Sequence, residues 1–135
     1  MPMPIPLVIS GSCGRMGSRI ATLALSDGTF TIGGAIEAKG HRAIGQDLGT
    51  VLGVKALGVR VTDDAAEALR AGEVLIEFTK PEVTVEHVRL AKQLKKPAVI
   101  GTTGLSQEQQ ATIADAALEI PIVLSPNMSV GVNLL

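Results

Sequence analysis

The sequence predicts a doubly wound α/β fold, in which one parallel sheet carries helices on both faces. Short apolar runs of strand length alternate along the chain with segments whose apolar residues recur at helical spacing. The runs are apolar at nearly every position, which is typical of parallel strands buried on both faces. Glycines directly after the first run indicate a tight turn from strand to helix.

The first half of the chain contains two predicted strands. The first covers residues 5–10 and has a proline near its start, where proline is tolerated. Residues 11–17 form a glycine loop, and residues 18–26 form a helix with its apolar residues on one face. The second strand covers residues 30–37. We expect residues 38–49 to be a loop, because three glycines interrupt them.

The second half is more regular. Its predicted strands span residues 59–62, 74–78, 97–101 and 120–124. Asp63 or Asp64 caps a predicted helix that ends near Arg70. Capping-box patterns predict two further helices, from residue 79 to about 95 and from residue 106 to about 118.

Length and composition restrict the class of protein. The 135 residues fit one domain. Twelve basic and thirteen acidic residues give a net charge of -1, which argues against electrostatic binding of nucleic acid or an anionic membrane. Two Phe residues, without Trp or Tyr, provide no stacking platform for single-stranded nucleic acid. A single cysteine, and no apolar run of the ~18 residues that a membrane helix needs, favour a cytoplasmic protein.

The glycine loop is the strongest chemical signal. It reads Gly11, Ser12, Cys13, Gly14, Arg15, Met16 and Gly17. A Rossmann-like dinucleotide site needs glycines for a tight turn, for approach to the pyrophosphate and for helix–strand packing, and its helix N-terminus attracts the phosphates. The spacing here is G-x-x-G-x-x-G and departs from G-x-G-x-x-G, so a turn without a ligand is the alternative.

Glu37 strengthens the dinucleotide hypothesis. It ends the second predicted strand, twenty positions after Gly17, where an acidic side chain accepts hydrogen bonds from the adenosine ribose. An acid there favours NAD, whereas nearby Arg15, Lys39 and Arg42 can balance its charge against a 2′-phosphate. Charge therefore leaves both NADH and NADPH open. A solvated strand-end carboxylate is the alternative for Glu37.

Further candidates follow the later strands, because ligands of open parallel sheets bind beyond the carboxyl ends of the strands. They are Phe78, Thr79, Gly101, Thr102, Thr103, Ser125, Pro126, Asn127 and Met128. Their hydroxyl and amide groups suit ribose and carboxamide hydrogen bonds, although turn formation selects the same residue types.

The histidines and the cysteine give weaker signals. We interpret His41 and His87 as surface residues; neither shares a metal-ligand spacing with the other or with Cys13, so no metal site is predicted. Cys13 lies at a helix start, where its pKa could be lowered, but we favour a packing role. The sequence has neither a G-x-S-x-G elbow nor a Walker lysine, which argues against hydrolase and P-loop functions.

Taken in order, four segments resemble the amino-terminal part of the dihydrodipicolinate reductase family. They are residues 11–17, 78–82, 99–104 and 127–133, and they extend over nearly the whole chain. The resemblance implies an oxidoreductase of lysine and diaminopimelate biosynthesis. Such an enzyme transfers a hydride from NADH or NADPH to a cyclic imine dicarboxylate, 4-hydroxy-tetrahydrodipicolinate.

The resemblance also implies roles for individual residues. Residues 11–16 would hold the pyrophosphate and Glu37 the adenosine ribose, whereas residues 101–103 and 125–128 would flank the nicotinamide. Family members that use NADPH well often carry an arginine directly after the acid. Here Ala38 occupies that position and Lys39 follows it, so we expect NADH to be favoured or the two cofactors to bind similarly.

The resemblance implies a second domain as well. We expect residues 1–126 to form a dinucleotide-binding domain and residues 127–135 to begin a hinge, with the substrate domain and the catalytic residues beyond Leu135. Nothing in the chain is a convincing acid for protonating the imine nitrogen, so the chain alone should bind cofactor and turn over little substrate. The full-length protein would be a homo-tetramer. The alternatives are another two-domain dehydrogenase and a stand-alone dinucleotide-sensing module.

Overall fold

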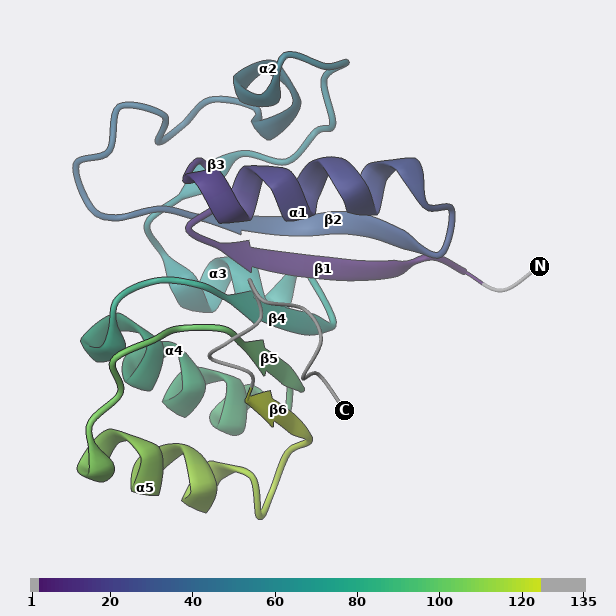
Figure 1. The fold of residues 1–135 in the computed structure, drawn as a ribbon. Helices are drawn as coiled ribbons and strands as arrows, with labels where there is room; N and C mark the ends of the chain where they lie inside the picture. The colour runs from purple at the N-terminus through teal and green to yellow at the C-terminus, as the bar shows by residue number, and fades with distance from the viewer. Residues whose placement is uncertain (1–2, 125–135) are drawn as a thin grey trace.

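Six strands form one parallel sheet in the computed structural model, which describes residues 3–124 (Figure 1). The strands are β1 (Ile5–Ser10), β2 (Phe30–Ile36), β3 (Val61–Thr62), β4 (Val74–Glu77), β5 (Ala98–Ile100) and β6 (Ile122–Leu124). The helices are α1 (Arg15–Ser26), α2 (Leu48–Leu52), α3 (Ala65–Arg70), α4 (Pro81–Leu94) and α5 (Gln107–Ala116). The sheet order β3-β2-β1-β4-β5-β6 confirms the predicted doubly wound fold.

The strands bury both faces of the sheet, in two hydrophobic clusters. In β1, Leu7 and Ile9 join the cluster that contains apolar residues of α1 and α2. Val8, between them, joins the opposite cluster, to which α3, α4 and α5 contribute. Because helices cover both faces (Figure 1), the strands are apolar at nearly every position, and this is why their runs were recognisable in the sequence.

The direction in which the sheet grows reverses beside β1. This strand pairs with β2 on one side and with β4 on the other. Strands β2 and β3 are therefore added on one side of β1, and strands β4, β5 and β6 are added on its other side. In open α/β sheets ligands bind at such a reversal, beyond the carboxyl ends of the strands. The glycine loop and the residues after β4 lie at this edge.

Three helices differ from the prediction. Helix α4 begins at Pro81, after an N-cap Lys80 that makes no side-chain cap hydrogen bond, so the capping box predicted at residue 79 is not formed. Helix α1 begins at Arg15, inside the glycine motif, because Gly14 takes the extended backbone of an N-cap (φ -78°, ψ 173°). Helix α2 (Leu48–Leu52) begins inside the loop predicted for residues 38–49 and continues into residues for which no element was predicted. It starts after Asp47, whose side chain accepts the Thr50 N–H, and it ends at Gly53 in the left-handed region (φ 79°).

Asp47 organises the segment between β2 and β3. Its carboxylate accepts the N–H groups of Thr50, Leu57, Gly58 and Val59 at distances of 2.7 to 3.3 Å. These hydrogen bonds, foremost the one from Leu57, lower the pKa of Asp47. The ionised carboxylate therefore contributes stability above the unfolded-state pKa of about 3.9, and this contribution is lost as the pH falls through the lower folded-state value.

We expect Asp47→Asn to lower the melting temperature at neutral pH, and to lower it progressively less once the pH falls below about 4. Thermal melts of both chains between neutral and strongly acidic pH measure this difference. Asp63→Asn is the control, because no N–H in the described part of the chain donates to that exposed carboxylate. A loss of stability that is equal at every pH would contradict the assignment.

Between residues 3 and 124, no helix is both long enough and apolar enough to span a membrane. In the same part of the chain, no group of three or more His, Cys, Asp or Glu side chains is arranged to hold a metal ion.

Candidate functional site

The glycine loop joins β1 to α1 and is held against the end of β2. The N–H groups of Gly11 and Ser12 donate to the Ile36 carbonyl oxygen at 2.9 and 3.2 Å. Gly11 lies in the left-handed region (φ 78°), which glycine adopts readily. A Cβ on Gly17 would overlap the Gly11 carbonyl oxygen, so the backbone of α1 approaches the loop as closely as glycine permits.

The start of α1 suits an anion. The N-cap Gly14 supplies no side-chain acceptor, and the first turn contains no acidic residue. Arg15 and Met16 are exposed at this end of the helix. The first-turn N–H groups and the positive end of the helix dipole therefore meet no carboxylate from their own helix, which is the arrangement that phosphate binding uses.

Glu37 lies directly after β2 and beside the glycine loop. Its Oε2 accepts the Cys13 N–H at 2.7 Å, and its Oε1 accepts the Ala38 N–H at 3.2 Å. The side chain is only partly buried, so carboxylate lone pairs remain for ribose hydroxyls. Glu37 and the glycine loop, which the sequence linked only through their spacing, are in direct contact.

The loops after β4 and β5 lie on the other side of the glycine loop. A Cβ on Gly11 would lie 3.2 Å from Cγ2 of Thr79. The Phe78 ring packs so closely on Gly101 that a Cβ there would overlap it. The Thr79 N–H donates to Oγ1 of Thr102 at 3.3 Å. The predicted residues after β1, β2, β4 and β5 are thus neighbours along one edge of the sheet.

The remaining predicted residues differ in exposure. Ser12 is buried, and its hydroxyl lies 3.5 Å from the Ile36 carbonyl oxygen. The exposed residues are Gly14, Arg15, Met16, Ala38, Lys39 and Thr103. Ser125, Pro126, Asn127 and Met128, together with the predicted domain boundary after residue 126, lie outside the described residues.

His87 is buried, and the prediction that it is a surface residue was wrong. It is 6% exposed, and its Nδ1 lies 2.8 Å from Oε1 of Glu77, which is fully buried. Charged neighbours at positions 86 and 89 suggested a solvent-facing helix surface, but His87 shares the inner face of α4 with Thr84 and Val88. Glu77 was missed as well. The signal available was a carboxylate at the end of an otherwise apolar strand.

Cys13 and His41 contribute to local structure. Burial raises the pKa of the Cys13 thiol, the hydrogen bond from Ser12 lowers it, and the Glu37 carboxylate raises it further. The pKa is raised overall, which contradicts a lowering by the helix start. His41 is half-buried, and its Nδ1 accepts the Ala43 N–H at 3.0 Å, so its ring orders the segment after β2.

Comparison with known proteins assigns the family. Residues 5–128 match the family model described as dihydrodipicolinate reductase, N-terminus. The chain belongs to the dihydrodipicolinate reductase family. Its curated relatives include the 4-hydroxy-tetrahydrodipicolinate reductases of Anaeromyxobacter dehalogenans and Geobacter sulfurreducens, which are 44% and 45% identical over 127 residues. Each alignment covers 94% of this chain and 47% of the relative, so the chain spans about half the length of these proteins.

Solved structures of the family and of other enzymes share the fold. The dipicolinate-bound dihydrodipicolinate reductase from Paenisporosarcina sp. TG-14 is 25% identical with a TM-score of 0.73, over 96% of this chain and 49% of that one. An amine dehydrogenase from Mycobacterium smegmatis is 28% identical with the same TM-score of 0.73, over 89% of this chain and 38% of that one. Because two different activities share this fold, the family model carries the assignment.

Proposed function

We propose that this chain is the dinucleotide-binding part of an NADH- or NADPH-dependent reductase of 4-hydroxy-tetrahydrodipicolinate. The observation that carries the proposal is the 2.7 Å hydrogen bond from the Cys13 N–H to Glu37 Oε2. It sets an acidic side chain against a glycine loop at the point where the sheet order reverses, which is the geometry of a dinucleotide site. Family membership supports the choice of substrate.

Each part of the edge then has a role. The glycine-loop N–H groups and the start of α1 hold the pyrophosphate. Glu37 accepts hydrogen bonds from the adenosine ribose hydroxyls. The loops at Thr79 and Thr103, with the predicted residues 125–128, orient the nicotinamide. The reduced cofactor supplies the hydride, and the protein supplies binding and orientation.

Reduction of 4-hydroxy-tetrahydrodipicolinate to tetrahydrodipicolinate replaces the hydroxyl group by hydride, so a proton must be supplied for the hydroxyl to leave as water. We assign this step and substrate binding to a part of the protein outside the present sequence, because the chain spans about half the length of its relatives. The complete protein would be a cytoplasmic homo-tetramer of lysine and diaminopimelate biosynthesis. The resemblance to the family supports this assembly.

Paired titrations of the purified chain with NADH and NADPH, measured by calorimetry, test the proposal. We expect saturable binding of at least one nucleotide, with NADH equal or favoured, since Ala38 stands directly after the acid and Lys39 is exposed one position later. Gly14→Trp should abolish binding, because its indole would fill the space that the pyrophosphate needs. Gly28→Trp, where a Cβ meets nothing within 4 Å, is the matched control. A folded chain that binds neither nucleotide would refute the proposal.

A further inference from the structure

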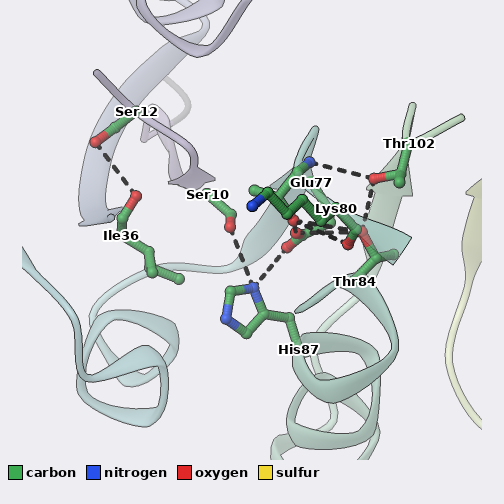
Figure 2. A network of polar contacts seen from close by, with 9 residues as sticks. Ser10, Ser12, Ile36, Glu77, Lys80, Thr84, His87 and Thr102 are labelled. Atoms are coloured by element: carbon green, nitrogen blue, oxygen red, sulfur yellow. Dashed lines mark hydrogen bonds and ion pairs between the residues drawn. The ribbon is translucent and has the colours of Figure 1, made fainter. Parts of the chain in front are cut away.

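A buried polar network lies beneath the candidate site (Figure 2). Its centre is Glu77, the last residue of β4, whose side chain is fully buried. Its other members are Ser10, Thr79, Thr84, His87 and Thr102. Burial of a carboxylate is costly unless hydrogen bonds compensate it. Each buried polar group of the network therefore needs a hydrogen-bond partner if this fold is to be stable.

Helix α4 holds one oxygen of the Glu77 carboxylate. His87 Nδ1 lies 2.8 Å from Oε1, and Ser10 Oγ lies 3.1 Å from the same nitrogen. Figure 2 shows the His87 ring directed from the helix toward both residues. An ionised carboxylate only accepts hydrogen bonds, so Nδ1 carries the hydrogen and donates it to Glu77. This bond ties α4 to the end of β4, and the separate contact with Ser10 ties α4 to the end of β1.

The second oxygen closes a ring of hydrogen bonds. Oε2 accepts the hydroxyls of Thr79 and, at 3.4 Å, Thr84. The hydroxyls of Thr84 and Thr102 lie 2.6 Å apart and share a hydrogen bond, in which Thr102 is the donor when the Thr84 hydrogen is directed at Oε2. Thr102 in turn accepts the Thr79 N–H at 3.3 Å. The ring starts and ends at Thr79, and every bond in it is oriented toward the carboxylate, so the bonds reinforce one another.

We propose that Thr84 and Glu77 are positioning residues, which hold the loops after β4 and β5 in place for the nicotinamide half of a bound dinucleotide. This inference rests on the proposed function. Thr84 is fully buried on α4 and acts through its neighbours. Thr79 lies against Gly11 of the glycine loop, and exposed Thr103 directly follows Thr102.

The adenosine half is held independently of this ring. It depends on Glu37, which bonds to the Cys13 and Ala38 N–H groups. Neither bond includes a member of the ring. Loss of the Thr84 hydroxyl should therefore weaken contacts to the nicotinamide half and leave those to the adenosine half unchanged. A purely structural role would affect both halves alike.

The test compares NADH with ADP, which has the adenosine and the pyrophosphate but neither the second ribose nor the nicotinamide. We expect Thr84→Val to raise the Kd of NADH about fivefold, the size of one hydrogen bond, and to leave the Kd of ADP unchanged. Thr84→Ser keeps the hydroxyl and should keep the wild-type ratio of the two constants. Thr112→Val is the matched control, because among residues 3–124 the Thr112 hydroxyl bonds only to the Glu108 carbonyl oxygen on α5.

Equal effects on both ligands, or none on either, would overturn the positioning role. If Thr84→Val does not fold, Thr84→Ala removes the same hydroxyl without adding a methyl group. The ratio of the two dissociation constants in that variant then tests the positioning role. A wild-type chain that binds neither ligand would refute the proposed function together with this inference. If the wild-type chain binds both ligands, and the variant without the Thr84 hydroxyl keeps the same ratio of the two dissociation constants, this inference alone is refuted.

Discussion

A chain in which Gly17 is replaced by alanine should lose much of its stability and its dinucleotide binding. The added Cβ would overlap the carbonyl group of Gly11 and lie 3.1 Å from the Ser12 Cα. These are backbone atoms, so no change of side-chain rotamer relieves the overlap, and α1 or the loop must move. Overpacking usually costs about 1–3 kcal/mol. We expect the upper end of that range, which lowers the melting temperature by about 10 °C.

Thermal melts and NADH titration of the same samples measure this effect. Gly28→Ala is the control, because a Cβ at that exposed position meets nothing within 4 Å. Its melting temperature should stay close to that of the wild type. At Gly14 a Cβ would lie 3.3 Å from the Gly11 oxygen. The Gly14→Ala chain should therefore still fold, but it should bind NADH more weakly than the wild type. A Gly17→Ala chain with wild-type stability would show that α1 does not approach the loop as described.

The fold was predictable because its signals are local. Each buried strand is a continuous apolar run, and each long helix has a cap or an apolar stripe of its own. Helix α2 lacks such a signal. It is five residues long, and Asp47, which caps it, also accepts N–H groups from Leu57, Gly58 and Val59. Those partners lie beyond the helix, where a local pattern does not reveal them.

The candidate site was predictable in part for the same reason. Glycine spacing and the acid after β2 are local patterns, and the structure brings Glu37 to the Cys13 N–H. The Glu77–His87 pair is different, because each partner is buried only in the presence of the other, and the bond crosses from β4 to α4. In the sequence, a histidine between charged residues looks solvent-facing, and its partner ten positions earlier looks like the end of a strand.

Replacing Glu37 with alanine should weaken the binding of NADH much more than that of NADPH. With NADH the variant loses hydrogen bonds from ribose hydroxyls to a charged acceptor. Such bonds are worth about 1.5–3 kcal/mol, or about 10–150-fold in Kd. With NADPH the wild-type carboxylate faces a 2′-phosphate of the same charge. Removal of that repulsion offsets the lost hydrogen bond, so the preference should move toward NADPH.

Parallel titrations of both nucleotides give the ratio of the two dissociation constants, which is the decisive quantity. Glu73→Ala removes an exposed acid at the opposite end of β4 and should leave the ratio unchanged. Ala38→Arg adds a cation beside the proposed 2′-phosphate position and should tighten NADPH alone. If Glu37→Ala instead weakens both nucleotides equally, the carboxylate acts only through the Cys13 N–H, as a support for the glycine loop. The ribose would then be recognised elsewhere, and cofactor choice would not depend on Glu37.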